Sequence, residues 1–272
     1  YTTRIGGITT GPNSLQGSMD EVRFYDYVRT PAQIAWEYSQ GKPVAWYRMD
    51  ECTGTTINDA SGNGLTGTLT NAATPGTCTT SGSWYNGAVG KINSSMDFDG
   101  TDDYISVPDA NPLDITKEIT ISAWVNPDVF GSCCQFVVNK DNVTSQRGYS
   151  LLFASNGKLS SYFFKSDSTS YQVDSNNNIL NAGVWSFIAV TYNSVTASAQ
   201  YYVNGVPVTT NVVSSTGGDI QSNTSDLWIG RRNYGPSPWP FDGKIDDVRI
   251  FNYALTTQQI QEVYNNGAVS FK

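Results

Sequence analysis

The stretch that decides the fold is WSFIAVTYNSVTASAQYYVNGVPVTT, residues 185–210. β-Branched and aromatic residues recur at every second position in its two halves, which predicts two half-buried strands. Asn204-Gly205 separates the final two runs and is the strongest hairpin signal in the chain, because both central residues of a type I′ turn need a positive φ. These residues therefore predict an antiparallel hairpin within a larger sheet.

The same alternation recurs along the chain in short runs bounded by Gly, Pro, Asn, Asp or Ser. Further runs are DYISV, ITISAWVNP, QFVVNK, YSLLFA, LSSYFFKS and DLWIGRR. No long helix is predicted. The fold class we predict is all-β, an antiparallel jelly-roll sandwich with one short helix after the last strand.

Two segments of the chain repeat each other. GSMDEVRFYDYVRTPAQIAWEYSQG, residues 17–41, returns as GKIDDVRIFNYALTTQQIQEVYNNG, residues 243–267. Each copy predicts a strand followed by a short helix that begins at a Thr with Gln three residues later and ends at a Gly.

This repeat predicts the domain organisation. Residues 42–267 form one complete sandwich, residues 1–41 carry the last strand and helix of a preceding copy, and residues 268–272, AVSFK, begin a following copy. A period of 226 residues suits one sandwich per repeat.

Composition excludes several functions. The chain has 272 residues, of which 39% are hydrophobic and 15% charged, as in an ordinary globular protein. A net charge of -8 and the lack of a basic run argue against binding to nucleic acid or to an anionic membrane. The chain contains no histidine, which rules out a Ser/His/Asp triad and any imidazole zinc site. No apolar run is long enough to span a membrane.

The four cysteines indicate an oxidising compartment. Cys52 and Cys78 bracket a segment rich in Gly, Thr, Ser and Asn, and a disulfide there would stabilise the fold by about 3 kcal/mol in the chain-entropy model. Two free thiols are the alternative. Cys133 and Cys134 are adjacent, and sequence leaves open whether they pair with each other, pair differently or stay reduced.

Seven motifs in order carry a family resemblance. They are VAWYRMDECTGTTINDASGNGLTGTL, MDFDGTDDYISVPD, ITISAWVNP, WSFIAVTYN, YYVNGVPV, LWIGRR and GKIDDVRIFNYALTTQQI. This set resembles the laminin G-like, or concanavalin A-like, jelly-roll domain over residues 42–267. Residues 17–41 resemble only the closing motif of that domain. The resemblance implies two curved antiparallel sheets in an extracellular or cell-surface module that serves adhesion, glycan or protein binding, or spacing.

Catalysis is not expected. Glycoside hydrolases that resemble this fold place carboxylates on one strand in a Glu-x-Asp-x-Glu arrangement, and no such string occurs here. The pairs Asp102-Asp103 and Asp246-Asp247 are adjacent, so on a regular strand their side chains would point to opposite faces. We expect a protein that is not an enzyme.

A structural Ca²⁺ is predicted from acidic turns and from the resemblance. The family often holds calcium near the junction of the first and last strands, which transfers to Asp59 and Asp246, with Asp99 or Asp50 as a third ligand. The alternative is that these aspartates cap turns through hydrogen bonds to backbone.

The candidate ligand-binding loop is RRNYGPSPWPFDG, residues 231–243. Its prolines would hold Tyr234 and Trp239 beside Arg231, an arrangement suited to carbohydrate. The alternative is that these rings cover the end of the sandwich. The four tryptophans within strand patterns are predicted to lie in the core; they are Trp46, Trp124, Trp185 and Trp228.

The sequence thus predicts a structural module of an extracellular filament or cell-surface repeat protein. Residues 1–41 would expose an unpaired strand unless another copy covers it, so the expected partners are other copies of the domain. The copies could be joined in one chain or exchange strands between chains. The alternative function is a glycan-binding adhesin module.

Overall fold

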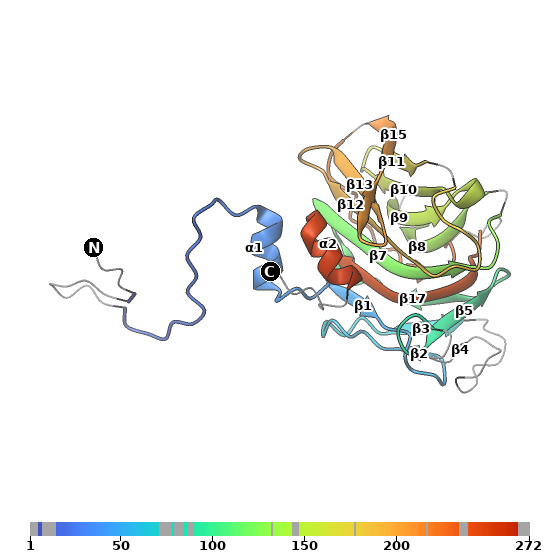
Figure 1. Ribbon diagram of the computed structural model, residues 1–272, viewed down its shortest axis with the longest axis horizontal. Coiled ribbons are helices and arrows are strands. Elements are labelled where there is room, and N and C mark those ends of the chain that lie inside the picture. Colours follow the sequence, from blue (N-terminus) through green and yellow to red (C-terminus); the bar gives the residue numbers. More distant parts are fainter. Residues whose placement is uncertain are drawn as a thin grey trace.

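The computed structural model shows a β-sandwich with an N-terminal tail that runs away from it (Figure 1). The predicted all-β jelly roll is confirmed. The structure describes residues 5–6, 15–70, 78, 84–85, 90–131, 133–142, 147–176, 178–215, 217–233 and 239–265.

One sheet has two helices on its outer face, and we call it the helix-covered sheet. Within the described residues its eight strands follow the order β14 (Val206–Val208), β13 (Ser198–Val203), β12 (Ser186–Asn193), β7 (Glu118–Pro127), β17 (Asp242–Phe251), β5 (Ser95–Asp99) and β4 (Trp84–Tyr85), with β1 (Ala45–Tyr47) also paired to β17. The first and last strands of the sandwich, β1 and β17, are therefore paired with each other.

The other sheet is the nine-stranded sheet. Its order in the described part of the chain is β15 (Thr210–Ser215), β11 (Ser170–Ser175), β10 (Leu159–Phe164), β9 (Arg147–Phe153), β8 (Gln135–Asp141), β16 (Leu227–Ile229), β6 (Tyr104–Val107), β3 (Gly67–Thr70) and β2 (Thr56–Ile57). Two 3₁₀ turns, η1 (Asn111–Leu113) and η2 (Ser155–Gly157), interrupt the connections. All the pairings in both sheets are antiparallel, as predicted.

The hairpin predicted at Asn204-Gly205 is confirmed. It joins β13 to β14, and Asn204 and Gly205 have φ of +50° and +77°. The neighbouring β12 pairs with β7 along its whole length, from Ser186 to Asn193. The stretch quoted above therefore forms three of the eight strands of the helix-covered sheet, β12, β13 and β14.

The main core lies between the two sheets. Its largest fully buried side chains include Tyr47 and Phe98 from the helix-covered sheet and Tyr149 and Phe163 from the nine-stranded sheet. The two buried tyrosine hydroxyls donate to backbone carbonyls, Tyr47 to Leu65 at 2.9 Å and Tyr149 to Leu113 at 3.1 Å. These bonds satisfy polar groups that would otherwise be costly inside the core.

A second apolar cluster lies on the outer side of the helix-covered sheet. Helix α2 (Thr257–Tyr264) places Ile260 and Val263 on Phe187 and Phe251 of the strands. Helix α1 (Pro31–Tyr38) lies beside α2 and adds Ala32 to the cluster (Figure 1).

Both predicted helices have the predicted start. The side chains of Thr30 and Gln33 cap α1 reciprocally, and those of Thr256 and Gln259 cap α2 in the same way. The strand predicted before α1 is absent, because residues 17–28 have no strand assignment and lie apart from either sheet. A strand needs a neighbour for its backbone groups, and none of the described residues supplies one here. The predicted final segment, residues 268–272, lies outside the described residues.

The predicted disulfide between Cys52 and Cys78 is present, with its Cα atoms 4.6 Å apart. Cys133 and Cys134 are paired with each other in this structure, which is one of the alternatives that sequence left open.

Candidate functional site

A row of polar and aromatic side chains crosses the outer face of the nine-stranded sheet. Direct pairing places Tyr162, Ser150, Asn139 and Trp228 side by side on β10, β9, β8 and β16. Directly opposed residues share a face. Since the flanking Leu151 lies in the core, the row faces away from it.

The rings of this row are only partly covered. Trp228 stacks on Tyr104 with centroids 4.0 Å apart, and Tyr162 stacks on Phe164 at 5.5 Å. Trp228, Tyr104 and Tyr162 are half-buried. The prediction that Trp228 belongs to the core was wrong, because a period of two identifies the two faces of a strand but not which of them points inward.

Three polar atoms at the base of the row have no hydrogen-bond partner among the described residues. They are Ser150 Oγ, Asn139 Oδ1 and Trp228 Nε1. The amide nitrogen of Asn139 donates to the carbonyl of Asp141 at 2.8 Å, which fixes the orientation of that side chain. Buried polar groups usually have partners, so these three atoms keep hydrogen-bonding capacity that no described residue uses, although each is almost inaccessible to solvent.

Two of the three predicted ligand-binding residues flank this row. Arg231 donates to the carbonyl of Asp102 at 3.2 Å and lies over the Tyr104 ring at 5.5 Å. Trp239 stacks on Phe136 with centroids 6.1 Å apart. The third, Tyr234, lies outside the described residues. Sequence reasoning found the flanking loop but missed the row itself, because its members come from four separate strands, of which β8, β9 and β10 are consecutive and β16 comes much later in the chain.

The neighbouring arginine is already paired. Arg232 donates to Asp141 Oδ2 at 2.8 Å and lies over the Trp239 ring at 5.1 Å. The central part of the row is therefore uncharged.

A cleft lies on the opposite side of the sandwich. It has a volume of about 480 Å³ and lies between α1, α2 and the junction of β1 with β17. Trp36 and Trp46 line it together with carboxylates and guanidinium groups, among them Asp50, Asp246 and Arg249.

The Trp46 ring is held tightly in this cleft. Arg48 lies over it at 4.1 Å and Arg249 at 4.5 Å, and its Nε1 donates to Asp247 Oδ1 at 2.6 Å. Arg249 also pairs with Asp247 at 2.8 Å. These cations compete with any sugar for the Trp46 ring. Trp46 is half-buried and outside the main core, so the prediction that it is a core residue was wrong too.

The other two tryptophans differ. Trp124 is buried as predicted, but in the helix-covered cluster and not between the sheets. Trp185 is half-buried and packs against that same cluster, so it also is not a core residue.

Asp246 sits on the floor of the cleft with one oxygen unused. Its Oδ2 accepts from the backbone N–H of Ile92 at 2.8 Å, whereas its Oδ1 is buried without a partner among the described residues. Burial, together with the negative charges of Asp247 and Asp50, raises the pKa of Asp246 to about 8, and the hydrogen bond from Ile92 limits this rise. Asp247 has a φ of +51° at a bulge in β17, which turns these neighbouring carboxylates toward one region.

The carboxylate of Asp59 forms hydrogen bonds within its own turn. Its two oxygens accept from the N–H groups of Trp46, Ser61 and Leu65 and from the Ser61 hydroxyl, at 2.7 to 3.1 Å. These bonds match the turn-capping alternative. The structure does not gather Asp59, Asp246 and Asp99 into one group of carboxylates, so calcium binding by these three residues stays a prediction.

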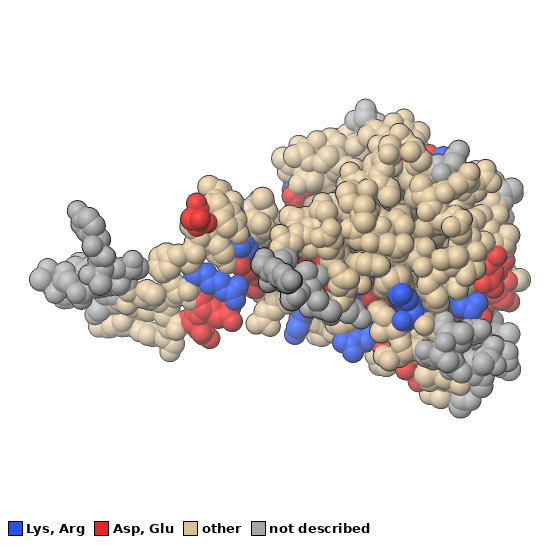
Figure 2. Space-filling view, viewed as in Figure 1, with Lys and Arg blue, Asp and Glu red and all other residues tan. Residues whose placement is uncertain are grey.

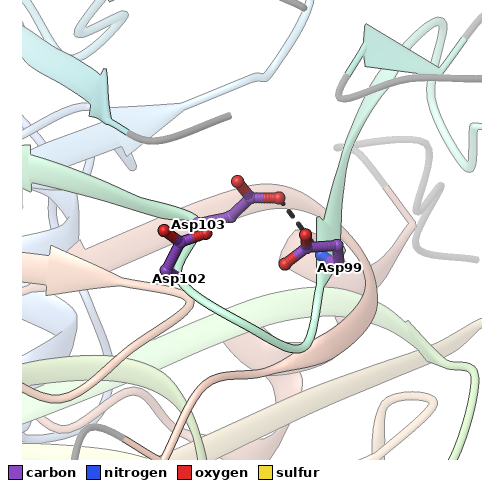
Figure 3. Close-up of side chains that lie close together, drawn as sticks. All are labelled: Asp99, Asp102 and Asp103. Atoms are coloured by element: carbon purple, nitrogen blue, oxygen red, sulfur yellow. Dashed lines mark hydrogen bonds between the residues drawn. The ribbon is translucent and has the colours of Figure 1, made fainter. Parts of the chain in front are cut away.

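Asp99 instead belongs to an acidic cluster in the turn between β5 and β6 (Figure 3). Asp99, Asp102 and Asp103 each present one oxygen within 4.8 Å of the others, a spacing that could hold a cation. Asp103 Oδ2 accepts from the N–H of Asp99 at 3.1 Å. Burial, reinforced by the neighbouring carboxylates, raises the pKa of Asp103 to about 6.

Surface charge is unevenly distributed. Figure 2 shows a sandwich surface that is largely uncharged in this view, with side chains of both signs gathered on the tail before α1. Among the described residues, no helix is long and apolar enough to cross a membrane.

The chain belongs to the concanavalin A-like lectin/glucanases superfamily, whose laminin G profile matches residues 99–261. The resemblance inferred from the seven motifs is thereby confirmed. No curated protein matches the sequence.

Solved structures share this fold. Domain 4 of AbnA, an extracellular GH43 arabinanase of Geobacillus stearothermophilus solved with arabinotriose, is 22% identical with a TM-score of 0.58, covering 82% of this chain and 98% of that one. The binding domain of Paraclostridial Mosquitocidal Protein 1 is 15% identical with a TM-score of 0.62, covering 84% of this chain and 53% of that one. The ligand binding domain of botulinum neurotoxin serotype D with N-acetylneuraminic acid is 14% identical with a TM-score of 0.58, covering 85% and 52%. The chain thus spans about half the length of these two toxin domains.

Proposed function

We propose that the chain is a non-catalytic, glycan-binding module whose site is the outer face of the nine-stranded sheet. One observation carries this proposal: half-buried Tyr162 and Trp228 flank Ser150 and Asn139, whose buried polar atoms lack partners among the described residues. Sugar rings offer apolar faces to aromatic side chains and hydroxyls to polar ones. The related fold of domain 4 of AbnA, solved with arabinotriose, supports this choice.

The ligand class follows from the charges. Arg232 is paired with Asp141, and Ser150, Asn139 and Trp228 are neutral. A neutral oligosaccharide therefore fits the centre of the row, whereas a sialylated glycan would need an arginine at its margin, either Arg231 or the Arg147 that lies over the Phe164 ring.

The experiment is a glycan array that includes arabino-oligosaccharides, followed by titration of each hit. Trp228→Ala should weaken binding about fivefold, since an aromatic contact is worth on the order of 1 kcal/mol. Trp46→Ala is the matched control, because it removes a half-buried tryptophan on the opposite side and should leave the affinity unchanged. Loss of binding in Trp46→Ala alone would move the site to the cleft.

We also propose that a structural Ca²⁺ binds in the cleft through Asp246 and Asp50. The unpartnered, buried Oδ1 of Asp246 fits a cation, and both residues line the same hollow. When bound, the ion would supply positive charge to this group of carboxylates. It would therefore stabilise the β1–β17 junction and take no part in a reaction.

Calcium titration of chelator-treated protein tests this proposal by thermal unfolding. We expect Ca²⁺ to raise the Tm of the native chain but not of Asp246→Asn. Asp99→Asn is the control. If it, and not Asp246→Asn, removes the response, the ion binds the acidic cluster between β5 and β6, and an unresponsive native chain would exclude calcium.

A second candidate function is structural, as a repeat module of an extracellular filament or cell-surface protein. The observation that favours it is the copy of the last strand and helix at residues 17–41, which has no sheet of its own. The disulfide between Cys52 and Cys78 supports an oxidising, extracellular location. Sedimentation and electron microscopy of the native material test whether copies associate; isolated, non-contacting particles would exclude assembly.

A further inference from the structure

The tail repeats one unusual backbone angle of β17, although it forms no strand itself. Residues 17–41 correspond to residues 243–267 with an offset of 226. In the second copy, Asp247 has a φ of +51° at the bulge of β17, and its counterpart Glu21 has a φ of +48°. Such values are uncommon outside glycine. The tail therefore repeats the positive φ of the β17 bulge, although no described strand is paired with it.

The ion pair of β17 is repeated as well. Arg249 pairs with Asp247 at 2.8 Å, and Arg23 pairs with Glu21 at 3.0 Å. Both pairs span two positions across the bulge. This correspondence extends the likeness from backbone angles to side chains.

The apolar side chains of the tail are exposed where those of β17 are buried. Phe24 is 72% exposed and its counterpart Ile250 is 0% exposed. Met19 and Val22 are likewise exposed, although Ile245 and Val248 at the same positions lie in the main core. The tail thus presents the inward face of a last strand to solvent.

Helix α1 has two different sides. One side packs on this sandwich, where Trp36 stacks on Phe251 at 6.2 Å and the Ser39 hydroxyl lies 3.0 Å from the hydroxyl of Tyr253. Gln259 of α2 also donates to the carbonyl of Ala32 at 3.4 Å. This side joins the tail to the helix-covered sheet.

The other side of α1 is open. Ile34 is 57% exposed and Tyr38 is 91% exposed. Their counterparts in α2 are Ile260, which is fully buried, and Tyr264, whose ring lies 5.4 Å from Trp124 and 5.6 Å from Phe187. The open side of α1 is therefore the side with which α2 covers its own sheet.

We infer that residues 18–28 and the open side of α1 dock on a second sandwich of the same kind, which receives residues 18–28 as its last strand. Helix α1 then lies between two sandwiches, with one on each side. The occupant is a copy encoded before residue 17 in the same polypeptide, because a separate copy of this chain already fills that place with its own β17. This inference rests on the structural function proposed above and is independent of glycan binding.

The test is a two-copy chain in which residues 42–242 are placed directly before Gly17 of the full chain. The first sandwich then has no β17 of its own, and residues 18–28 are the segment that can supply its last strand. The control is a tandem chain that carries residues 243–267 at the junction in place of residues 17–41. It tests whether two sandwiches joined in this way fold. Backbone hydrogen exchange of residues 18–28 is compared between the two-copy chain and the 272-residue chain.

We expect residues 18–28 to exchange rapidly in the 272-residue chain and as slowly as β17 in the two-copy chain. Phe24→Asp should abolish that protection, whereas Asp26→Ala should keep it, because the counterpart Asn252 is exposed. A first body that stays unfolded, or rapid exchange in both chains, would contradict the inference. Protection already present in a dimer of the 272-residue chain would assign the occupant to a separate chain instead. Neither result bears on the affinity for glycans measured with Trp228→Ala.

Discussion

The outer faces of the two sheets differ in what covers them. The helix-covered sheet turns Trp124, Phe187 and Phe251 outward, and α2 buries them. The nine-stranded sheet turns half-buried rings outward, together with Ser150 and Asn139, which are almost fully buried although no described helix lies over them. Apolar residues on an outer face thus predict a covering element, while a mixed polar and aromatic face is suited to a ligand.

Truncating one aromatic ring on each face tests this difference between the two sheets most strongly. Phe251→Ala should lower the free energy of unfolding by about 3 kcal/mol or more, because Phe251 is fully buried beneath the helices. Tyr162→Ala should cost about 1 kcal/mol, since its ring is half-buried. Denaturant unfolding measures both, and equal costs would contradict the distinction.

A smaller effect is expected from pH at the turn that leads into the nine-stranded sheet. The folded-state pKa of Asp103, about 6, lies above its unfolded value. Between these two pKa values the folded chain binds more protons at Asp103 than the unfolded chain does. The contribution of Asp103 to the free energy of unfolding therefore falls as pH rises toward 6 and is fully lost above it.

Asp103→Asn should remove this dependence and raise stability at pH 7.5 by on the order of 1 kcal/mol. Unfolding free energies at several pH values between 4 and 7.5 provide the measurement. An unchanged pH profile in the variant would contradict the assignment. Asp102→Asn, at an exposed neighbour, is the comparison: it should lower the pKa of Asp103, because it removes a nearby negative charge, but should keep the pH dependence.

The two helix caps offer a comparison within the covered face. Thr256→Ala should destabilise the sandwich by about 1 kcal/mol, because α2 is part of the cooperative unit. Thr30→Ala removes the same cap from α1 and should change the global unfolding free energy by only a few tenths of a kcal/mol. Similar losses in both variants would mean that α1 is as tightly integrated as α2.

The sequence predicted features that depend on local chemistry. The alternating runs, the turn at Asn204-Gly205 and the Thr/Gln caps each follow from a few neighbouring residues, and all are confirmed. It failed where a tertiary neighbour decides. Residues 17–28 carry the pattern of a strand but lack a partner, and the strand tryptophans Trp46, Trp185 and Trp228 lie outside the main core.

The candidate site shows the same limit. Arg231 and Trp239 were predicted from one loop, and they do lie beside the polar row. The row itself depends on the pairing of β8, β9, β10 and β16, which sequence spacing does not reveal. Likewise, the family resemblance predicts that Asp59 and Asp246 bind one calcium ion. In the structure both carboxylate oxygens of Asp59 accept hydrogen bonds within its own turn, whereas Asp246 keeps one oxygen without a partner among the described residues.

The most direct test of the glycan-binding proposal is a crystal structure of the chain with the strongest neutral oligosaccharide from the array. The account predicts a sugar ring against Trp228 or Tyr162, with hydroxyls directed at Ser150 and Asn139. Sugar bound only in the cleft beside Trp46, or no bound sugar at saturating concentration, would contradict it.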